Sequence, residues 1–139
     1  MAELSRSVAA LRIFGDELVP GDITALLGGE PTASAVKGGR KQPNSGGRVH
    51  TALTGSWMRT VEDREPADGD AQIASLLEGL TSDLRVWQGL AARFRVDLFF
   101  GLFLSEGNEG FSLEPSTLAA LGERGIKLDL DIYSARRTD

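Results

Sequence analysis

The sequence predicts an α+β fold, a ferredoxin-like β-α-β-β-α-β sandwich extended by one further helix and strand. Short apolar runs rich in β-formers alternate along the chain with segments of helical periodicity. A strand-like run followed by a loop and a proline-initiated helix occurs twice, at 8–27 and at 96–123. This order predicts a largely antiparallel sheet with helices packed on one face.

The first half of the chain supplies three of the predicted elements. Residues 8–14 are apolar apart from Arg12 and predict a strand. A short helix is expected over 20–27, because Pro20 suits a first helical turn and a Gly-Gly pair follows Leu27. Residues 31–36 are expected to be extended.

Residues 37–48 predict a flexible, basic, glycine-rich loop. This stretch carries four positive charges and no negative one, and it lacks the residue order of a phosphate-binding loop. A strand is expected next, over 50–61, with His50 at its start and with Leu53 and Trp57 as apolar anchors.

The second half predicts two helices and two strands. Apolar residues spaced three and four apart predict one long helix over 71–94, although Gly79 and Gly89 weaken it. The nearly all-apolar run 96–104 predicts a central strand, and a third helix is expected over 115–123. The last strand, 126–133, alternates cleanly. Its expected inward side chains are Ile126, Leu128, Leu130 and Ile132.

Composition sets the broad class. With 139 residues, 41% hydrophobic and 25% charged, the chain fits a single domain over 1–139. A net charge of -5 argues against nucleic acid and against membrane surfaces as partners. There is no cysteine, which excludes disulfides and thiol catalysis. Neither a secretory signal nor a membrane-spanning stretch is recognisable, so we expect a cytoplasmic protein.

Strand alternation predicts which side chains share the sheet face opposite the helices. They are Arg12, Phe14, Asp97, Phe99, Phe103, Lys127, Asp129, Asp131 and Tyr133. Aromatic and charged residues on an open sheet resemble a platform for stacking bases, but the carboxylates argue against that use. A protein partner or a second copy fits better, and a solvated surface is the simplest alternative.

No catalytic residue, metal site or cofactor is predicted. Asp129 and Asp131 lie two positions apart on one strand, a spacing of roughly 7 Å that suits an acid/base pair or a hard cation. Alternation on any exposed strand produces the same spacing, however, and Arg12 and Lys127 are potential ion-pair partners.

The loop 105–112 is the most distinctive local signal, with two glycines around Asn108 and with Phe111 as an expected anchor. It permits an alternative function. A small-molecule-binding domain or an enzyme would have its site between the 15–16 turn and this loop. The residues expected to converge there are Arg12, Asp16, Lys37, Trp57 and Asn108.

An ordered set of short motifs also suggests a family. The segments 11–16, 20–28, 107–113 and 128–133, with Trp57 between them, together resemble a bacterial family known as domain of unknown function 4279. The resemblance spans about Leu11 to Tyr133 and implies a single-domain protein. It brings no activity, cofactor or catalytic residue to carry over.

The function we favour from the sequence is therefore a small acidic, non-enzymatic binding or interaction protein. It would act through the open sheet face and the 105–112 loop. Immunity-like neutralisation of a basic protein partner is one form of this role, by analogy with acidic proteins that neutralise nuclease toxins.

Overall fold

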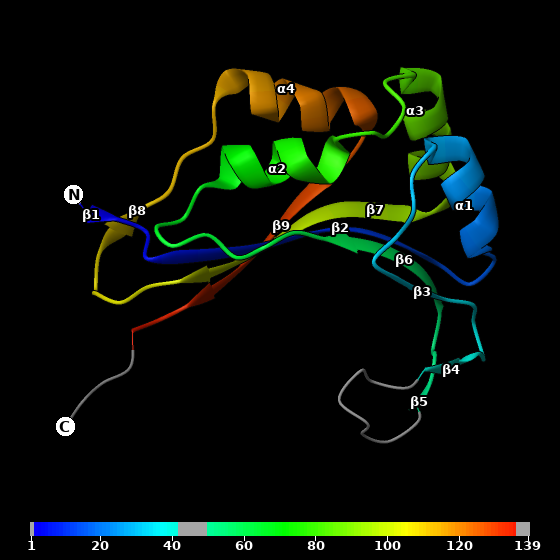
Figure 1. Ribbon diagram of the computed structural model, residues 1–139, viewed down its shortest axis with the longest axis horizontal. Helices are drawn as coiled ribbons and strands as arrows, with labels where there is room; N and C mark the ends of the chain where they lie inside the picture. The colour runs from blue at the N-terminus through cyan, green and yellow to red at the C-terminus, as the bar shows by residue number, and fades with distance from the viewer. Residues whose placement is uncertain (1, 42–49, 136–139) are drawn as a thin grey trace.

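A five-stranded mixed sheet covered by helices on one face forms the body of the molecule (Figure 1). The computed structural model describes residues 2–41 and 50–135. The strand order is β3-β6-β2-β7-β9. The strands are β2 (Arg6–Gly15), β3 (Ala33–Ala35), β6 (Gly55–Thr60), β7 (Arg95–Phe103) and β9 (Lys127–Tyr133).

The strand directions confirm the predicted fold class. β2 is antiparallel to both β6 and β7, and β3 is antiparallel to β6, which is the arrangement of a ferredoxin-like core. β9 extends this sheet by pairing parallel to β7. The helix between them, α4 (Pro115–Arg124), provides the crossover that parallel strands require.

Proline begins the first and last helices, as expected, and a glycine follows each of them. α1 (Pro20–Leu27) and α4 each begin with proline in the first turn. Each ends at a glycine in the left-handed region, Gly28 with φ 81° and Gly125 with φ 73°. A glycine there accepts the positive φ without steric cost. α1 ends at the expected Gly-Gly pair, whereas α4 runs one residue beyond the expected 115–123 and contains Gly122.

The single long helix expected over 71–94 is wrong. The structure has two helices, α2 (Gly69–Leu77) and α3 (Leu84–Arg93). Gly79 adopts φ 76°, and the N–H of Thr81 donates to the carbonyl of Leu27, outside the segment. Asp83 then caps α3 by accepting from the N–H of Arg85 at 3.0 Å. The turn at Gly79 and the cap at Asp83 therefore divide this segment into two helices, although apolar residues recur along its whole length.

The core lies between the sheet and the helices. Trp87 is fully buried and donates from Nε1 to the carbonyl of Thr81 at 2.7 Å. Further buried side chains come from the four helices and from strands β2, β6 and β7. They include Leu11, Ile13, Ile23, Leu27, Trp57, Ile73, Leu76, Leu90, Leu98, Phe100, Leu102 and Leu121.

The expected strand over 50–61 is interrupted. It forms β5 (His50–Thr51) and β6, and Leu53 between them is 90% exposed, so it is not an apolar anchor. β5 pairs with β4 (Arg40–Lys41) at the start of the predicted 37–48 loop. Residues 42–48 of that loop lie outside the described part of the chain.

A second small pairing joins the N-terminus to the loop after β7. β1 (Ala2–Glu3) runs parallel to β8 (Glu109–Gly110). Among the residues that the structure describes, no helix has the length and apolar character needed to span a membrane.

Candidate functional site

The sheet face opposite the helices, called the open face below, carries the side chains that strand alternation predicted. The register places Asp97 beside Arg12 of β2 and beside Lys127 of β9. Two positions further along β9, Asp129 lies beside Phe99. Charged and aromatic residues from three neighbouring strands therefore form one continuous surface.

An ion pair lies at the centre of the open face. Arg12 Nε donates to Asp97 Oδ1 at 2.7 Å, and its Nη2 donates to Asp97 Oδ2 at 2.9 Å. The Asp97 side chain is fully buried, whereas Arg12 is 23% exposed. Hydrogen bonding to Asp97 raises the pKa of Arg12. The charge of Asp97 is thus compensated within the protein and is not available to a partner.

The remaining carboxylates of the open face lie on β9. Asp129 Oδ2 is 3.7 Å from Arg12 Nη2, and its side chain is 43% exposed. Asp131, two residues further along the strand, is exposed. These two side chains carry the accessible negative charge of the face.

Arginine side chains lie over the aromatic rings of the open face. The Arg12 guanidinium carbon is 4.5 Å from the centroid of Phe99, and that of Arg6 is 4.0 Å from Phe103. Phe103 also stacks on Tyr133, with ring centroids 4.6 Å apart and an interplanar angle of 6°. The rings are therefore held in place by the protein's own cations and by each other.

The outer half of β9 departs from the predicted burial. Ile126 is buried, but Leu130 is 44% exposed and Ile132 is 65% exposed, although both were expected to face the core. β9 is the last strand of the sheet and runs out from beneath the helix layer (Figure 1). The strand alternates as predicted, but no described helix covers its second half.

The two loops expected to share a small-molecule site lie at opposite ends of the sheet. β2 pairs antiparallel with β7, so Phe14 lies opposite Arg95 and Arg6 lies opposite Phe103. The 15–16 turn and the 105–112 loop are therefore separated by about nine residues of strand, on the order of 30 Å. The predicted site between them does not form.

The residues assigned to that site separate into different environments. Arg12 pairs with Asp97, as described, and Asn108 is exposed in the distant loop. Trp57 is fully buried beneath α1, where its Nε1 donates to Thr24 Oγ1 at 3.1 Å. Trp57 is therefore a core residue and not a binding residue.

Asp16 and Lys37 do meet. Lys37 Nζ donates to Asp16 Oδ2 at 3.1 Å, and this hydrogen bond holds the pKa of Asp16 below its usual value. Both side chains are exposed, so the pair contributes little to stability. Asp16 also lines a shallow cavity of about 250 Å³ with Phe14, Gly15, Thr54 and Arg95.

The 105–112 loop is fastened to the rest of the protein by Glu109 and Phe111. Glu109 accepts hydrogen bonds from the Ser105 N–H at 2.9 Å and from Ser5 Oγ at 2.8 Å. Bonding from the Ser105 backbone is the main reason that the pKa of Glu109 is lowered. Phe111 packs edge-on against Phe100 at 5.3 Å, as expected of an anchor. Much of the loop's distinctive sequence therefore serves structure.

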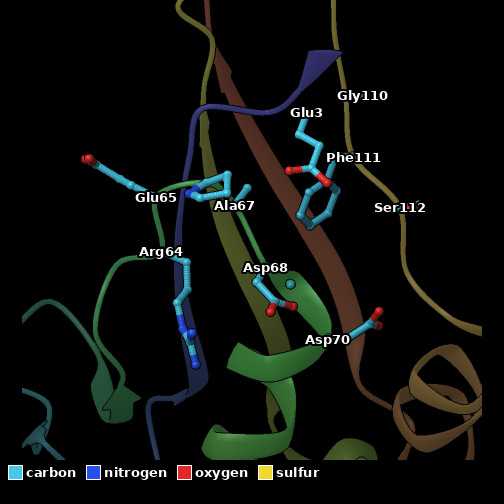
Figure 2. A pocket seen from close by; sticks show the side chains of 11 residues that line it. Glu3, Arg64, Glu65, Ala67, Asp68, Asp70, Gly110, Phe111 and Ser112 are labelled. Atoms are coloured by element: carbon cyan, nitrogen blue, oxygen red, sulfur yellow. The ribbon is translucent and has the colours of Figure 1, made fainter. Parts of the chain in front are cut away.

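A larger cavity of about 510 Å³ lies beside this loop. In Figure 2 the side chains of Glu3, Asp68 and Phe111 approach the open space, whereas Glu65 points away from it. Glu3 and Asp68 are not among the site residues expected from the sequence. The sequence signal that could have pointed to Asp68 is the acidic segment 62–70, within which Asp68 is the N-cap of α2.

No group of three His, Asp or Glu side chains within residues 2–41 and 50–135 is placed to hold a metal ion. No curated protein and no solved structure matches the chain. One family matches residues 3–135, under the description "Domain of unknown function (DUF4279)". Because that match covers nearly the whole chain, the protein belongs to the domain of unknown function 4279 family.

Proposed function

We propose that the protein is a non-enzymatic interaction protein that binds another protein through β9, the strand at the edge of its open face. One observation carries this proposal. β9 exposes Leu130, Ile132 and Tyr133 on the same strand as the accessible carboxylates of Asp129 and Asp131. Apolar side chains that stay exposed beside polar ones, on a strand with one free edge, are typical of an interaction site.

The 105–112 loop extends the same surface. The N–H of Leu104 donates to the carbonyl of Tyr133 at 3.1 Å, so the loop begins beside the end of β9. Glu106 and Asn108 in this loop are exposed. A partner seated on the outer half of β9 would therefore also reach the loop.

Charge favours a basic partner. The protein carries a net charge of -5, and the exposed acids of the open face, Asp129 and Asp131, lie together on β9. Complementary charge speeds association and selects among partners. Immunity-like neutralisation, in which this acidic surface covers a basic site on another protein, is the specific role that we propose.

The aromatic rings support a protein partner over nucleic acid. Guanidinium groups already lie over Phe99 and Phe103, and Phe103 stacks on Tyr133. A base would have to displace these contacts in order to stack. The exposed carboxylates next to the rings would repel its phosphates.

The test compares two charge-matched variants as affinity baits in a lysate of cells that produce the protein. Asp129→Lys/Asp131→Lys reverses the charges on the open face. Glu78→Lys/Glu123→Lys makes the same change in net charge at two exposed positions at or near the C-terminal ends of helices α2 and α4. Lysine suits a helix C-terminus, so the control variant should fold normally.

We expect the parent protein and the control variant to retain the same basic protein, and the open-face variant to lose it. Retention should weaken as salt rises. If all three baits retain the same proteins equally, the open face is not the binding surface. Thermal unfolding of each bait shows that a loss of binding does not reflect a loss of fold.

A second candidate function is the binding of a small molecule in the cavity beside Glu3, Asp68 and Phe111. The volume of about 510 Å³ is within the range of small-molecule sites. The acidic residues of its lining outnumber the single arginine, Arg64, and together with the Phe111 ring they favour an organic cation. Thermal shift measurements with a panel of amines and of carboxylic acids test this. An amine that raises the Tm of the parent protein should raise that of Glu3→Gln less. Equal shifts in the two proteins would contradict the assignment.

A further inference from the structure

Within residues 2–41 and 50–135, the backbone groups on the outer edge of β9 pair with no other strand. β9 is the last strand of the sheet, and no described strand pairs with its outer side. The hydrogen bond from the Leu104 N–H to the Tyr133 carbonyl fixes which backbone groups point inward. Because the two backbone groups of a strand residue share one side and successive residues alternate, every second residue points outward. The outward residues are Leu128, Leu130 and Ile132.

The side chains along this edge form two chemically different rows. Asp129 and Asp131 lie on the open face, and both are accessible. Leu130 and Ile132 lie on the opposite face, and both are exposed. A strand added next to β9 would place alternate side chains beside the acids and beside the apolar pair.

We propose that β9 binds its partner by strand addition, and that the occupant is an extended segment of another protein in which basic and apolar residues alternate. This inference rests on the proposed function and specifies how the partner is held. Main-chain hydrogen bonds to the outward residues supply affinity. The two rows of side chains supply specificity, because a shift of one residue would bring basic side chains against Leu130 and Ile132.

Charge disfavours a second copy of the chain in the register that centres the strand pair on Leu130. In an antiparallel pair of two β9 strands centred on Leu130, Asp129 of each copy would lie opposite Asp131 of the other. Like charges directly opposite each other destabilise a strand pair. Charged side chains of this kind discourage self-pairing of sheet edges, and a basic strand would turn the same charges into attraction.

A synthetic peptide of alternating lysine and valine, as long as β9, tests the inference on the full chain. On binding, we expect the backbone amides of Leu128, Leu130 and Ile132 to exchange with solvent at least about tenfold more slowly, as measured by NMR. Affinity should fall at least roughly tenfold in Asp129→Lys/Asp131→Lys. It should change little in Glu78→Lys/Glu123→Lys, and a peptide of alternating glutamate and valine should not bind.

Two N-methylated versions of the peptide separate strand addition from simple charge attraction. Methylation of the amides that face β9 should weaken binding by at least roughly tenfold, and methylation of the alternate set should not. In an antiparallel pair, the peptide residue directly opposite Leu130 has its side chain on the same face as Leu130 and exchanges backbone hydrogen bonds with it. That residue is a valine, so sensitivity of the valine amides would show that the added strand is antiparallel. If the lysine amides are sensitive, it is parallel.

Three results would overturn the inference. One is equal binding of the unmodified peptide and both methylated peptides. Another is a peptide that does not bind. The third is slowed exchange of the same amides at high protein concentration without peptide, since the occupant would then be a second copy. The affinity-bait comparison is independent of this test, so retention of a partner together with unprotected β9 amides would refute strand addition and leave the proposed function standing.

Discussion

The ion pair at the centre of the open face predicts unequal costs for the removal of its two members. Asp97 is fully buried and Arg12 is 23% exposed. Arg12→Met would leave a buried carboxylate without two hydrogen bonds, so we expect a loss of about 3–5 kcal/mol in the free energy of unfolding. Asp97→Val leaves an arginine that can still approach Asp129 and water, so we expect a loss of only about 1–2 kcal/mol.

The double variant completes the cycle. With both charges absent, the position is an apolar contact, and we expect Arg12→Met/Asp97→Val to lose about 1–2 kcal/mol in total. The coupling between the two residues is then about 2–6 kcal/mol. Urea denaturation monitored by tryptophan fluorescence gives the free energy of unfolding of the parent, the two single variants and the double variant. Equal m-values for the four proteins would show that these free energies can be compared.

An exposed ion pair in the same sheet region provides the control. Arg6 and Asp63 are 3.2 Å apart with side chains 36% and 45% exposed, so Asp63→Ala should lose less than about 1 kcal/mol. Equal costs for Arg12→Met and Asp97→Val, with no coupling between them, would refute the reasoning that the burial of Asp97 dominates the pair.

Three further predictions concern the scaffold. Gln72→Leu should lower the free energy of unfolding, measured by urea denaturation, by about 2–3 kcal/mol. The buried amide of Gln72 accepts from Ser7 Oγ at 2.6 Å and donates to the Ser7 carbonyl at 2.9 Å, and leucine can make neither bond. A loss below about 1 kcal/mol would contradict this. Gly79→Ala should destabilise the protein by about 1 kcal/mol, because φ is 76° at this position. Gly89→Ala should stabilise it by about 0.5–1 kcal/mol, because Gly89 lies inside α3 with open space around it. Equal effects of the two substitutions would argue against the break between α2 and α3. The pKa of Glu109 is lowered in the folded state, so its contribution to stability is complete above its unfolded pKa, near 4.5, and is lost as pH falls through the folded pKa. The Tm difference between parent and Glu109→Gln should therefore shrink as pH falls below about 4.5, and a constant difference would show that the carboxylate charge is not responsible.

Local signals in the sequence were sufficient for most elements of the fold. Pro20 with Gly28 and Pro115 with Gly125 set the bounds of α1 and α4. Strand alternation correctly assigned Arg12, Asp97 and Asp129 to one face, because the side-chain period of a strand is independent of its neighbours.

Non-local pairing accounts for most of what the sequence did not reveal. The antiparallel register of β2 and β7 puts the 15–16 turn and the 105–112 loop at opposite ends, and no local pattern encodes that register. Trp57 was expected both as an apolar anchor of its strand and as a site residue, and its burial beneath α1 confirms the anchor. Similarly, Ile132 has the periodicity of a buried residue but lies beyond the helix layer.

Site-specific photocrosslinking tests the central claim most directly. A photoreactive phenylalanine analogue replaces Tyr133 on the open face in one protein and Glu123 on α4 in another, each expressed in the cells that produce the chain. We expect the analogue at position 133 to crosslink to one basic protein, and the analogue at position 123 not to do so. Crosslinking at position 123 but not at 133, or at neither position, would contradict an interaction role for the open face.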